Sequence, residues 1–231
     1  LDLPDWSTKF FRNPANESTM QATIAEAAAW LSRFRAAAPA ASFYVIEGNH
    51  DARLWKLMGE ALPQMWNVKA ANSEHPVLSL PNLLDFQTLG INFCGPYPNG
   101  EFWLNENLRC SHGDQHRSRS GDTARLVLQD ARCSEIFGHV HRTESVAVTR
   151  WSHRGPITYK AVSPGTMARL TGPIPRYNNR VNWQQGLGFA EFELGNGGFN
   201  VDVMNIYEGE GIFRGKKYIG EDEGLIFQVA A

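Results

Sequence analysis

The stretch Glu135-Ile136-Phe137-Gly138-His139-Val140-His141 passes from a short apolar run directly into a glycine and two histidines. Polar side chains that follow a short strand are typical of the loops where α/β proteins bind their ligands. Residues two apart on an extended segment point to the same side, so His139 and His141 are expected to face one centre or two adjacent ones. The stretch therefore predicts an α/β fold with a site where this strand ends.

Two clusters upstream have the same form. Gly48-Asn49-His50-Asp51 and Ser111-His112-Gly113-Asp114 each follow a short apolar run, so all three clusters are expected where strands end in loops. Imidazole nitrogens combined with amide and carboxylate oxygens suit Zn, Mn or Fe, whereas sites for Mg or Ca are typically all oxygen. The grouping therefore predicts a transition-metal site.

A long helix is predicted before the first cluster, over residues 17–38, because apolar residues such as Met20 and Ile24 recur at intervals of three and four. Its alanine content favours the helix, and Pro39 ends it. Residues 42–46 follow as a short β-rich run that leads into the first cluster. A helix followed by a strand is the connection expected in a layered α/β fold.

The other predicted elements frame the second and third clusters. Helices are expected over 52–62 and 123–131, single strands near 91–94, 108–111 and 135–137, and hairpins over 144–148 with 157–162 and over 186–194 with 199–206. Residues 63–89 carry a mixed pattern. Residues 207–231 are rich in glycine and charge and are predicted to form a surface extension or an oligomer arm.

The composition is that of an ordinary globular domain. The chain has 231 residues, 42% of them apolar and 20% charged, which is enough for one substantial core. A net charge of −2 gives no general footprint for a nucleic-acid backbone, although Arg117, Arg119 and Arg125 form a local basic strip after His112. No apolar run reaches the roughly 18 residues of a membrane span, so no membrane partner is expected.

The three cysteines, Cys94, Cys110 and Cys133, include no C-x-x-C pair, and any internal disulfide leaves one over. This usage favours a reducing compartment and predicts a cytoplasmic protein. We interpret all three as small apolar residues of the interior rather than metal ligands.

The three clusters, in this order, resemble the calcineurin-like metallophosphoesterase superfamily, particularly its phage and bacterial members. The family pattern is Asp-x-His, Gly-Asp-x-x-Asp, Gly-Asn-His-Asp/Glu, a lone His, and Gly-His-x-His. The last three blocks are present, and Ser163-Pro164-Gly165-Thr166 looks like the turn that follows the final block. The resemblance covers roughly residues 1–170. It implies a four-layer α/β/β/α sandwich, which we place in residues 1–206 with 207–231 as an extension.

By the same resemblance, the first two blocks would lie upstream of Leu1, with Leu1-Asp2 as the tail of the second. The domain and its metal site are then expected to be N-terminally incomplete. An alternative is a permuted site, because Asp114-Gln115-His116 spells Asp-x-His and Gly121-Asp122 follows it. That spacing is too short for a strand and its crossover, and Gly121-Asp122 is better interpreted as a turn that begins a helix.

The resemblance also implies a ligand set. Asn49, His112 and His139 would bind a second metal ion, and His141 would bind the first together with the upstream groups. Two divalent ions, Mn, Fe or Zn, are expected in the complete protein. Gly48 and Gly138 would let the backbone approach the ions closely.

Catalytic and substrate-binding roles follow in the same way. His50 would perform acid-base work on the leaving oxygen, and Asp2 would orient its ring. Asp51 is interpreted as a residue that shapes the loop. The candidates for holding substrate phosphate are Arg53, His116, Arg117 and Arg142. His75 and His153, outside any block, are interpreted as ordinary structural histidines.

The predicted activity is hydrolysis of a phosphomonoester or phosphodiester, the substrate partner, by metal-bound hydroxide. One alternative is a nuclease of the same superfamily, against which the near-neutral charge counts. Another is a phosphate-binding or scaffold protein whose turnover is impaired because blocks are missing. A homo-oligomer is left open. The seven tryptophans are interpreted as packing residues rather than base-stacking platforms, Trp183 among them.

Overall fold

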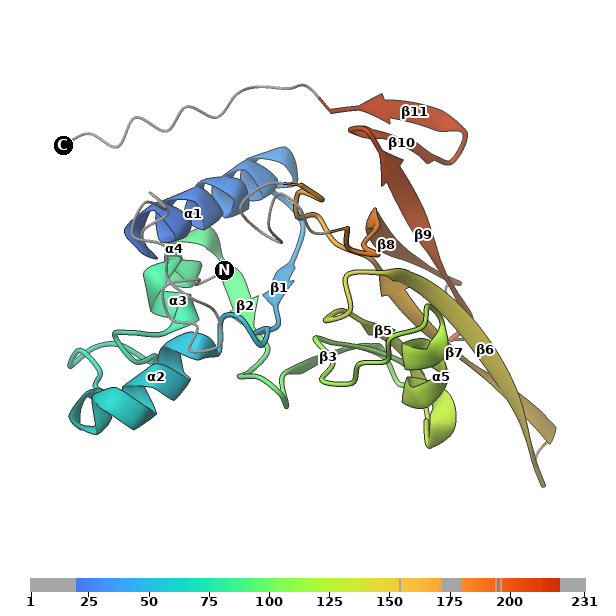
Figure 1. Ribbon diagram of the computed structural model, residues 1–231, viewed down its shortest axis with the longest axis horizontal. Coiled ribbons are helices and arrows are strands. Elements are labelled where there is room, and N and C mark those ends of the chain that lie inside the picture. Colours follow the sequence, from blue (N-terminus) through green and yellow to red (C-terminus); the bar gives the residue numbers. More distant parts are fainter. Residues whose placement is uncertain (1–19, 154, 172–179, 194, 196, 221–231) are drawn as a thin grey trace. The chain divides into compact units, whose positions relative to one another are not determined.

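A computed structural model of the chain describes residues 20–153, 155–171, 180–193, 195 and 197–220 (Figure 1). These residues form a mixed α/β protein that divides into two compact units between Gly100 and Glu101. We call residues 20–100 unit 1 and the described residues from 101 to 220 unit 2. No described helix is both long and apolar enough to cross a lipid bilayer.

Unit 1 contains two short parallel strands and several helices. Its elements are α1 (Met20–Ala37), β1 (Phe43–Val45), α2 (Arg53–Ala61), the 3-10 turn η2 (Pro63–Met65), α3 (Leu80–Leu83), α4 (Phe86–Leu89) and β2 (Ile91–Phe93). The predictions for α1, β1, α2 and β2 are confirmed within one or two residues over the described range. The mixed segment 63–89 resolves into three short helical turns.

The core of unit 1 joins α1 to the strands. Ile24 of α1 packs with Leu84, Phe86 and Ile91. Arg35, in the last turn of α1, donates hydrogen bonds to the backbone oxygens of Ala41, Leu89 and Gly90. These bonds tie the end of α1 to the residues that directly precede β2. β1 and β2 pair in parallel, so both strands end at the same edge of unit 1.

Unit 2 is built on a five-stranded sheet of order β3-β4-β5-β7-β6. Its strands are β3 (Glu101–Asn105), β4 (Leu108–Ser111), β5 (Ser134–Phe137), β6 (Thr143–Ser152) and β7 (Gly155–Pro164), with helix α5 (Asp122–Gln129) between β4 and β5. β4, β5 and β7 run parallel, and β6 and β7 form the predicted hairpin. β3 had no sequence prediction.

A second sheet in unit 2 has the order β11-β10-β9-β8 and is antiparallel throughout. It consists of β8 (Gln185–Phe192), β9 (Phe199–Tyr207), β10 (Glu210–Phe213) and β11 (Lys216–Ile219). The hairpin predicted over 186–194 and 199–206 is confirmed as β8–β9. The stretch predicted as an extension contributes β10 and β11 to this sheet, and its residues 221–231 lie outside the described range.

Alternate side chains of the five-stranded sheet pack on opposite faces. Phe137 and Ala161 pack against α5, whereas Val162 and Leu108 pack against Val201 of the second sheet. Unit 2 therefore has three layers, namely helix, sheet and sheet (Figure 1). The site described next lies where β4 and β5 end.

Candidate metal centre

Two of the predicted ligands lie side by side at the ends of neighbouring parallel strands. Ser111 of β4 and Phe137 of β5 are in register, so the residues that follow both strands emerge at one edge of the sheet. The rings of His112 and His139 have their centroids 5.5 Å apart and meet edge to face at 75°. The sequence patterns predicted that both histidines follow strand ends, and the parallel pairing of β4 and β5 places their rings side by side.

Gly138 holds the two histidine loops close together. Its N–H donates to the His112 carbonyl oxygen at 3.0 Å. A Cβ at this position would lie 3.3 Å from that oxygen, which is tighter than most Cβ contacts, and 3.7 Å from His112 Nδ1, which is an ordinary contact. The close approach required of Gly138 is therefore, in this structure, an approach to the neighbouring histidine loop.

The prediction that His139 and His141 lie on an extended segment is wrong. Their φ angles are 69° and 57°, both left-handed, and Val140 N–H closes a tight turn by donating to the Gly138 oxygen at 2.8 Å. A non-glycine residue in this region costs roughly 1–3 kcal/mol and persists only where surrounding contacts enforce it. Such strain concentrates at functional sites, and here it falls on two predicted metal ligands in succession.

His141 lies against a residue that the sequence did not assign to the site. Its ring centroid is 4.3 Å from that of Trp183, in an edge-to-face arrangement. The backbone adds to this contact, because Gln184 N–H donates to the His141 oxygen at 3.1 Å. Trp183 is a packing residue, as predicted, but the ring it packs against is a predicted ligand. No sequence signal placed these two residues together, because they are separated by two strands.

A buried ion pair supports the turn. Arg142 is 5% exposed and donates from Nε to Glu144 Oε1 at 3.0 Å, while its Nη2 donates to the Arg117 oxygen at 2.7 Å. Glu144, 3% exposed, accepts from Ala124 N–H of α5 through its other oxygen at 2.9 Å. The pair thus ties the histidine turn, the loop before α5 and the first turn of α5 to one another. Arg142, predicted to bind substrate, has its guanidinium inside the fold.

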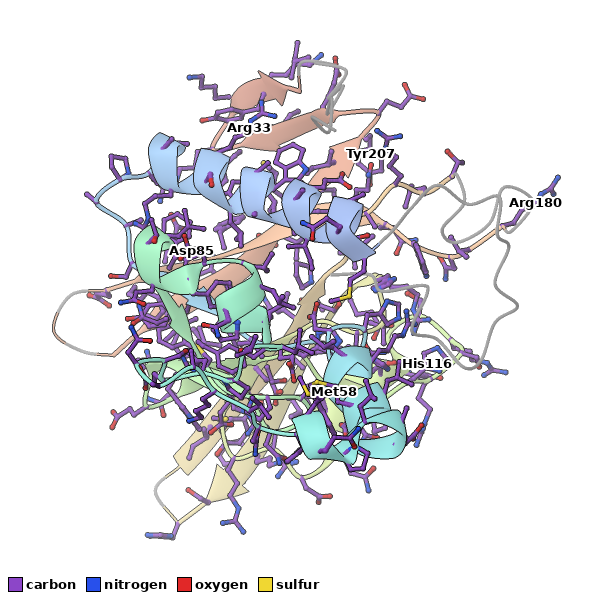
Figure 2. The ribbon with its side chains drawn as sticks, turned by 90° about the vertical axis from the view of Figure 1, so that its left-hand side faces the viewer. Arg33, Met58, Asp85, His116, Arg180 and Tyr207 are labelled. Atoms are coloured by element: carbon purple, nitrogen blue, oxygen red, sulfur yellow. The ribbon has the colours of Figure 1, made fainter. Side chains whose placement is uncertain are left out.

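The loop between His112 and α5 carries the other basic candidates. His116, labelled in Figure 2, and Arg117 have exposed side chains in this loop, and Arg117 Nη1 donates to the His116 oxygen at 3.0 Å. Arg117 N–H donates to Thr123 Oγ1 at 3.1 Å. α5 begins at Asp122 after Gly121, whose φ is 85°. The interpretation of Gly121-Asp122 as a turn plus helix start is confirmed, and the permuted alternative loses one of its two blocks.

The first cluster lies in unit 1, where β1 leads into α2. Asp51 Oδ2 accepts from Gly48 N–H at 2.9 Å, and Ala52 N–H donates to the Gly48 oxygen at 3.0 Å. The loop-shaping role predicted for Asp51 is confirmed. Asn49 and His50 are half-buried on this loop, and Arg53 opens α2. Asp2, the predicted orienter of His50, lies outside the described residues.

Burial changes the pKa of two thiols and one carboxyl. It raises the pKa of Cys133, an effect that nearby Arg109 partly offsets, and it raises the pKa of Cys94. Thiols that stay protonated are poor metal ligands, in keeping with their interpretation as interior residues. Burial also raises the pKa of Glu47, against the lowering effect of hydrogen bonds from Tyr97 and Trp55.

The separation of the two histidine rings is close to that of two imidazoles bound to one ion. Two imidazole nitrogens about 2.0–2.1 Å from one tetrahedral ion place their ring centroids about 5 Å apart, close to the 5.5 Å between His112 and His139. Within the described part of the chain, no three His, Cys, Asp or Glu side chains gather into one metal-binding group.

Comparisons of the chain with protein-family models, with curated proteins and with solved structures give no match.

Proposed function

We propose that this chain is a metal-dependent phosphoesterase of the calcineurin-like type, with a four-layer α/β/β/α sandwich fold. The observation that carries the proposal is the contact between His112 and His139 at the ends of two parallel strands, on a turn with strained backbone at His139 and His141. The helix, sheet and sheet layers of unit 2 support the sandwich part of the proposal.

In this proposal His112 and His139 hold one divalent ion, with Asn49 as a further ligand, and His141 holds another with groups outside the described residues. Bound Mn, Fe or Zn ions would neutralise phosphoryl oxygens and lower the pKa of an attacking water. His50 would deliver a proton to the leaving oxygen, a contribution of roughly 10²–10⁴-fold. Arg53, His116 and Arg117 would contact substrate phosphate.

Arg142 takes a different role in this proposal from the one expected of it. A guanidinium that already donates to Glu144 and to the Arg117 oxygen is suited to holding the histidine turn in place. We therefore assign Arg142 and Glu144 as positioning residues. The free cysteines of the described residues support the further proposal of a reducing, cytoplasmic location.

The test compares two histidine variants of the full chain. Binding of Mn²⁺ or Zn²⁺ is measured by calorimetry, and hydrolysis is followed with p-nitrophenyl phosphate and its bis ester. His139→Ala is expected to abolish metal-dependent hydrolysis and to weaken metal binding. His153→Ala, an exposed histidine of the same unit, is the matched control and is expected to retain both.

Equal activity in His139→Ala and the parent chain would refute the site. The ester preference distinguishes the alternatives, because a preference for the bis ester favours the nuclease. Metal binding without hydrolysis of either ester, or of DNA, favours the phosphate-binding protein.

A further inference from the structure

Unit 1 contains a cavity of about 330 Å³ that the proposed phosphoesterase site does not use. It is walled mainly by apolar and aromatic side chains, among them Leu54, Trp55, Met58, Trp66 and Phe93, with Met58 labelled on α2 in Figure 2. All residues that line it belong to unit 1. Its volume lies in the usual range of small-molecule pockets, about 300–1,000 Å³, and apolar walls with few polar groups are typical of them.

One carboxylate in the cavity wall uses only one of its two oxygens as a hydrogen-bond acceptor within the described residues. Glu47 is 6% exposed, and its Oε2 accepts from Trp55 Nε1 at 3.0 Å and from Tyr97 N–H at 2.9 Å. From the described residues, no donor reaches its Oε1. A carboxylate oxygen can accept two hydrogen bonds, so Oε1 is available to accept one from a ligand in the cavity. A ligand with an N–H group would supply that hydrogen bond.

The other polar groups of the wall also favour a donating ligand. The Ser79 hydroxyl donates its hydrogen to the Pro76 oxygen at 2.6 Å, so towards a ligand it can act only as an acceptor. Asn67, which could donate, is exposed. Glu47 and Ser79 therefore offer acceptors to a ligand that presents N–H groups, and the half-buried His75 and Tyr97 are the other polar residues of the wall.

The aromatic walls favour a flat, uncharged ring. Trp55 and Trp66 meet edge to face with centroids 5.9 Å apart, and His75 meets Phe93 likewise at 6.1 Å. Aromatic faces bind planar bases by stacking. The ammonium of Lys56 already lies 5.5 Å from the Trp55 ring centroid and 5.4 Å from that of Tyr97. A cationic ligand would be repelled by this charge, whereas a neutral ring would not.

We infer that this cavity binds a nucleobase that carries an exocyclic amino group, adenine or cytosine, with its N–H donated to Glu47 Oε1. Binding of the base requires no catalysis. Only the corollary, that the ester hydrolysed is that of a nucleotide, rests on the proposed function.

The experiment is calorimetric titration of the full chain with adenosine, cytidine and uridine, which contain no phosphate and so report on the cavity alone. Adenosine and cytidine are expected to bind about tenfold or more tightly than uridine, because uridine has a carbonyl oxygen in place of the exocyclic amino group that donates to Glu47 in the inferred pose. In Glu47→Gln, the amide oxygen must keep the Trp55 and Tyr97 hydrogen bonds, so the NH₂ replaces Oε1. The preference should then reverse in favour of uridine.

Glu60→Gln, an exposed change on α2 of the same unit, is the matched control and should keep the parent order of affinities. Trp66→Ala should weaken every nucleoside by about fivefold or more, from the loss of stacking. A short oligoadenylate distinguishes the source of the base: tighter binding than adenosine assigns it to a nucleic-acid strand, and weaker binding assigns it to a free nucleoside or nucleotide.

Absence of nucleoside binding, or an unchanged preference in a folded Glu47→Gln variant, would overturn the inference. If Glu47→Gln fails to fold, an unchanged adenosine affinity in Trp66→Ala overturns it instead. If the chain binds nucleosides but hydrolyses no ester, the assignment of the cavity stands and the proposed phosphoesterase function is refuted. The failure of one proposal can therefore be told from the failure of the other.

Discussion

The histidine turn of unit 2 and the cavity of unit 1 are built in opposite ways. The turn is made of consecutive residues, Gly138 to Arg142, whose backbone is strained and whose support is a buried ion pair. The cavity is made mainly of apolar residues that are scattered along the sequence between Glu47 and Tyr97. A site whose functional residues are adjacent in the chain can be recognised from a local sequence pattern. A site formed by the packing of distant residues cannot.

The largest expected effect comes from breaking the ion pair under the turn. Arg142→Met leaves the buried Glu144 carboxylate without its partner, which should lower the free energy of unfolding by about 3–5 kcal/mol. Urea unfolding at neutral pH measures it. Arg125→Met removes the exposed partner of Asp122, whose ion pair spans 3.3 Å, and as the control it should cost at most about 1 kcal/mol.

The positioning role of Arg142 is tested by a second measurement on the same variant, namely its affinity for metal ions. If Arg142 holds the histidine turn, the affinity for Mn²⁺ or Zn²⁺ should fall under conditions where the variant is still folded, and Arg142→Lys should restore part of it. A loss of stability with unchanged metal affinity would make the pair a stabilising feature only.

Much of the fold around the histidine turn could be predicted from the sequence, whereas the cavity could not. The helices and strands with clear periodicity were predicted nearly to the residue, as for α1 and β4, because their apolar spacing has one solution. The strand ends that carry His112 and His139 followed from the same patterns. Asp51 was interpreted as a loop-shaping residue, and its carboxylate accepts the Gly48 N–H, a bond that short polar side chains commonly make in turns.

Other features depended on long-range contacts that no local pattern encodes. The left-handed backbone of His139 and His141 contradicts the local preference of both residues and exists because the surrounding fold enforces it. Glu144 as the partner of Arg142, and Trp183 against His141, require knowledge of which strands pair. The Glu47 cavity requires the packing of two segments that are about fifty residues apart.

A smaller effect tests whether the turn really stores strain. His139→Gly and His139→Ala both remove the imidazole, but only glycine adopts a φ of 69° without a steric cost. The glycine variant should therefore be more stable than the alanine variant by about 1 kcal/mol in thermal or urea unfolding. At His153, where no such backbone angle is found, the order should be reversed or equal. Equal stabilities at position 139 would mean that the turn is relaxed.

The smallest effect uses a thiol in the interior of unit 2. Burial raises the pKa of Cys133 above its ordinary value of 9.0, so the folded state holds this proton more tightly than the unfolded state does. The stability from this thiol is complete below pH 9.0 and is lost as the pH rises through the folded-state pKa. The difference in unfolding free energy between the parent chain and Cys133→Ala should thus shrink with increasing alkalinity, as urea titrations across that range would measure. A difference that stays constant would mean that Cys133 is reached by water, and the packing of β5 against its neighbours would then be looser than the burial of Phe137 indicates.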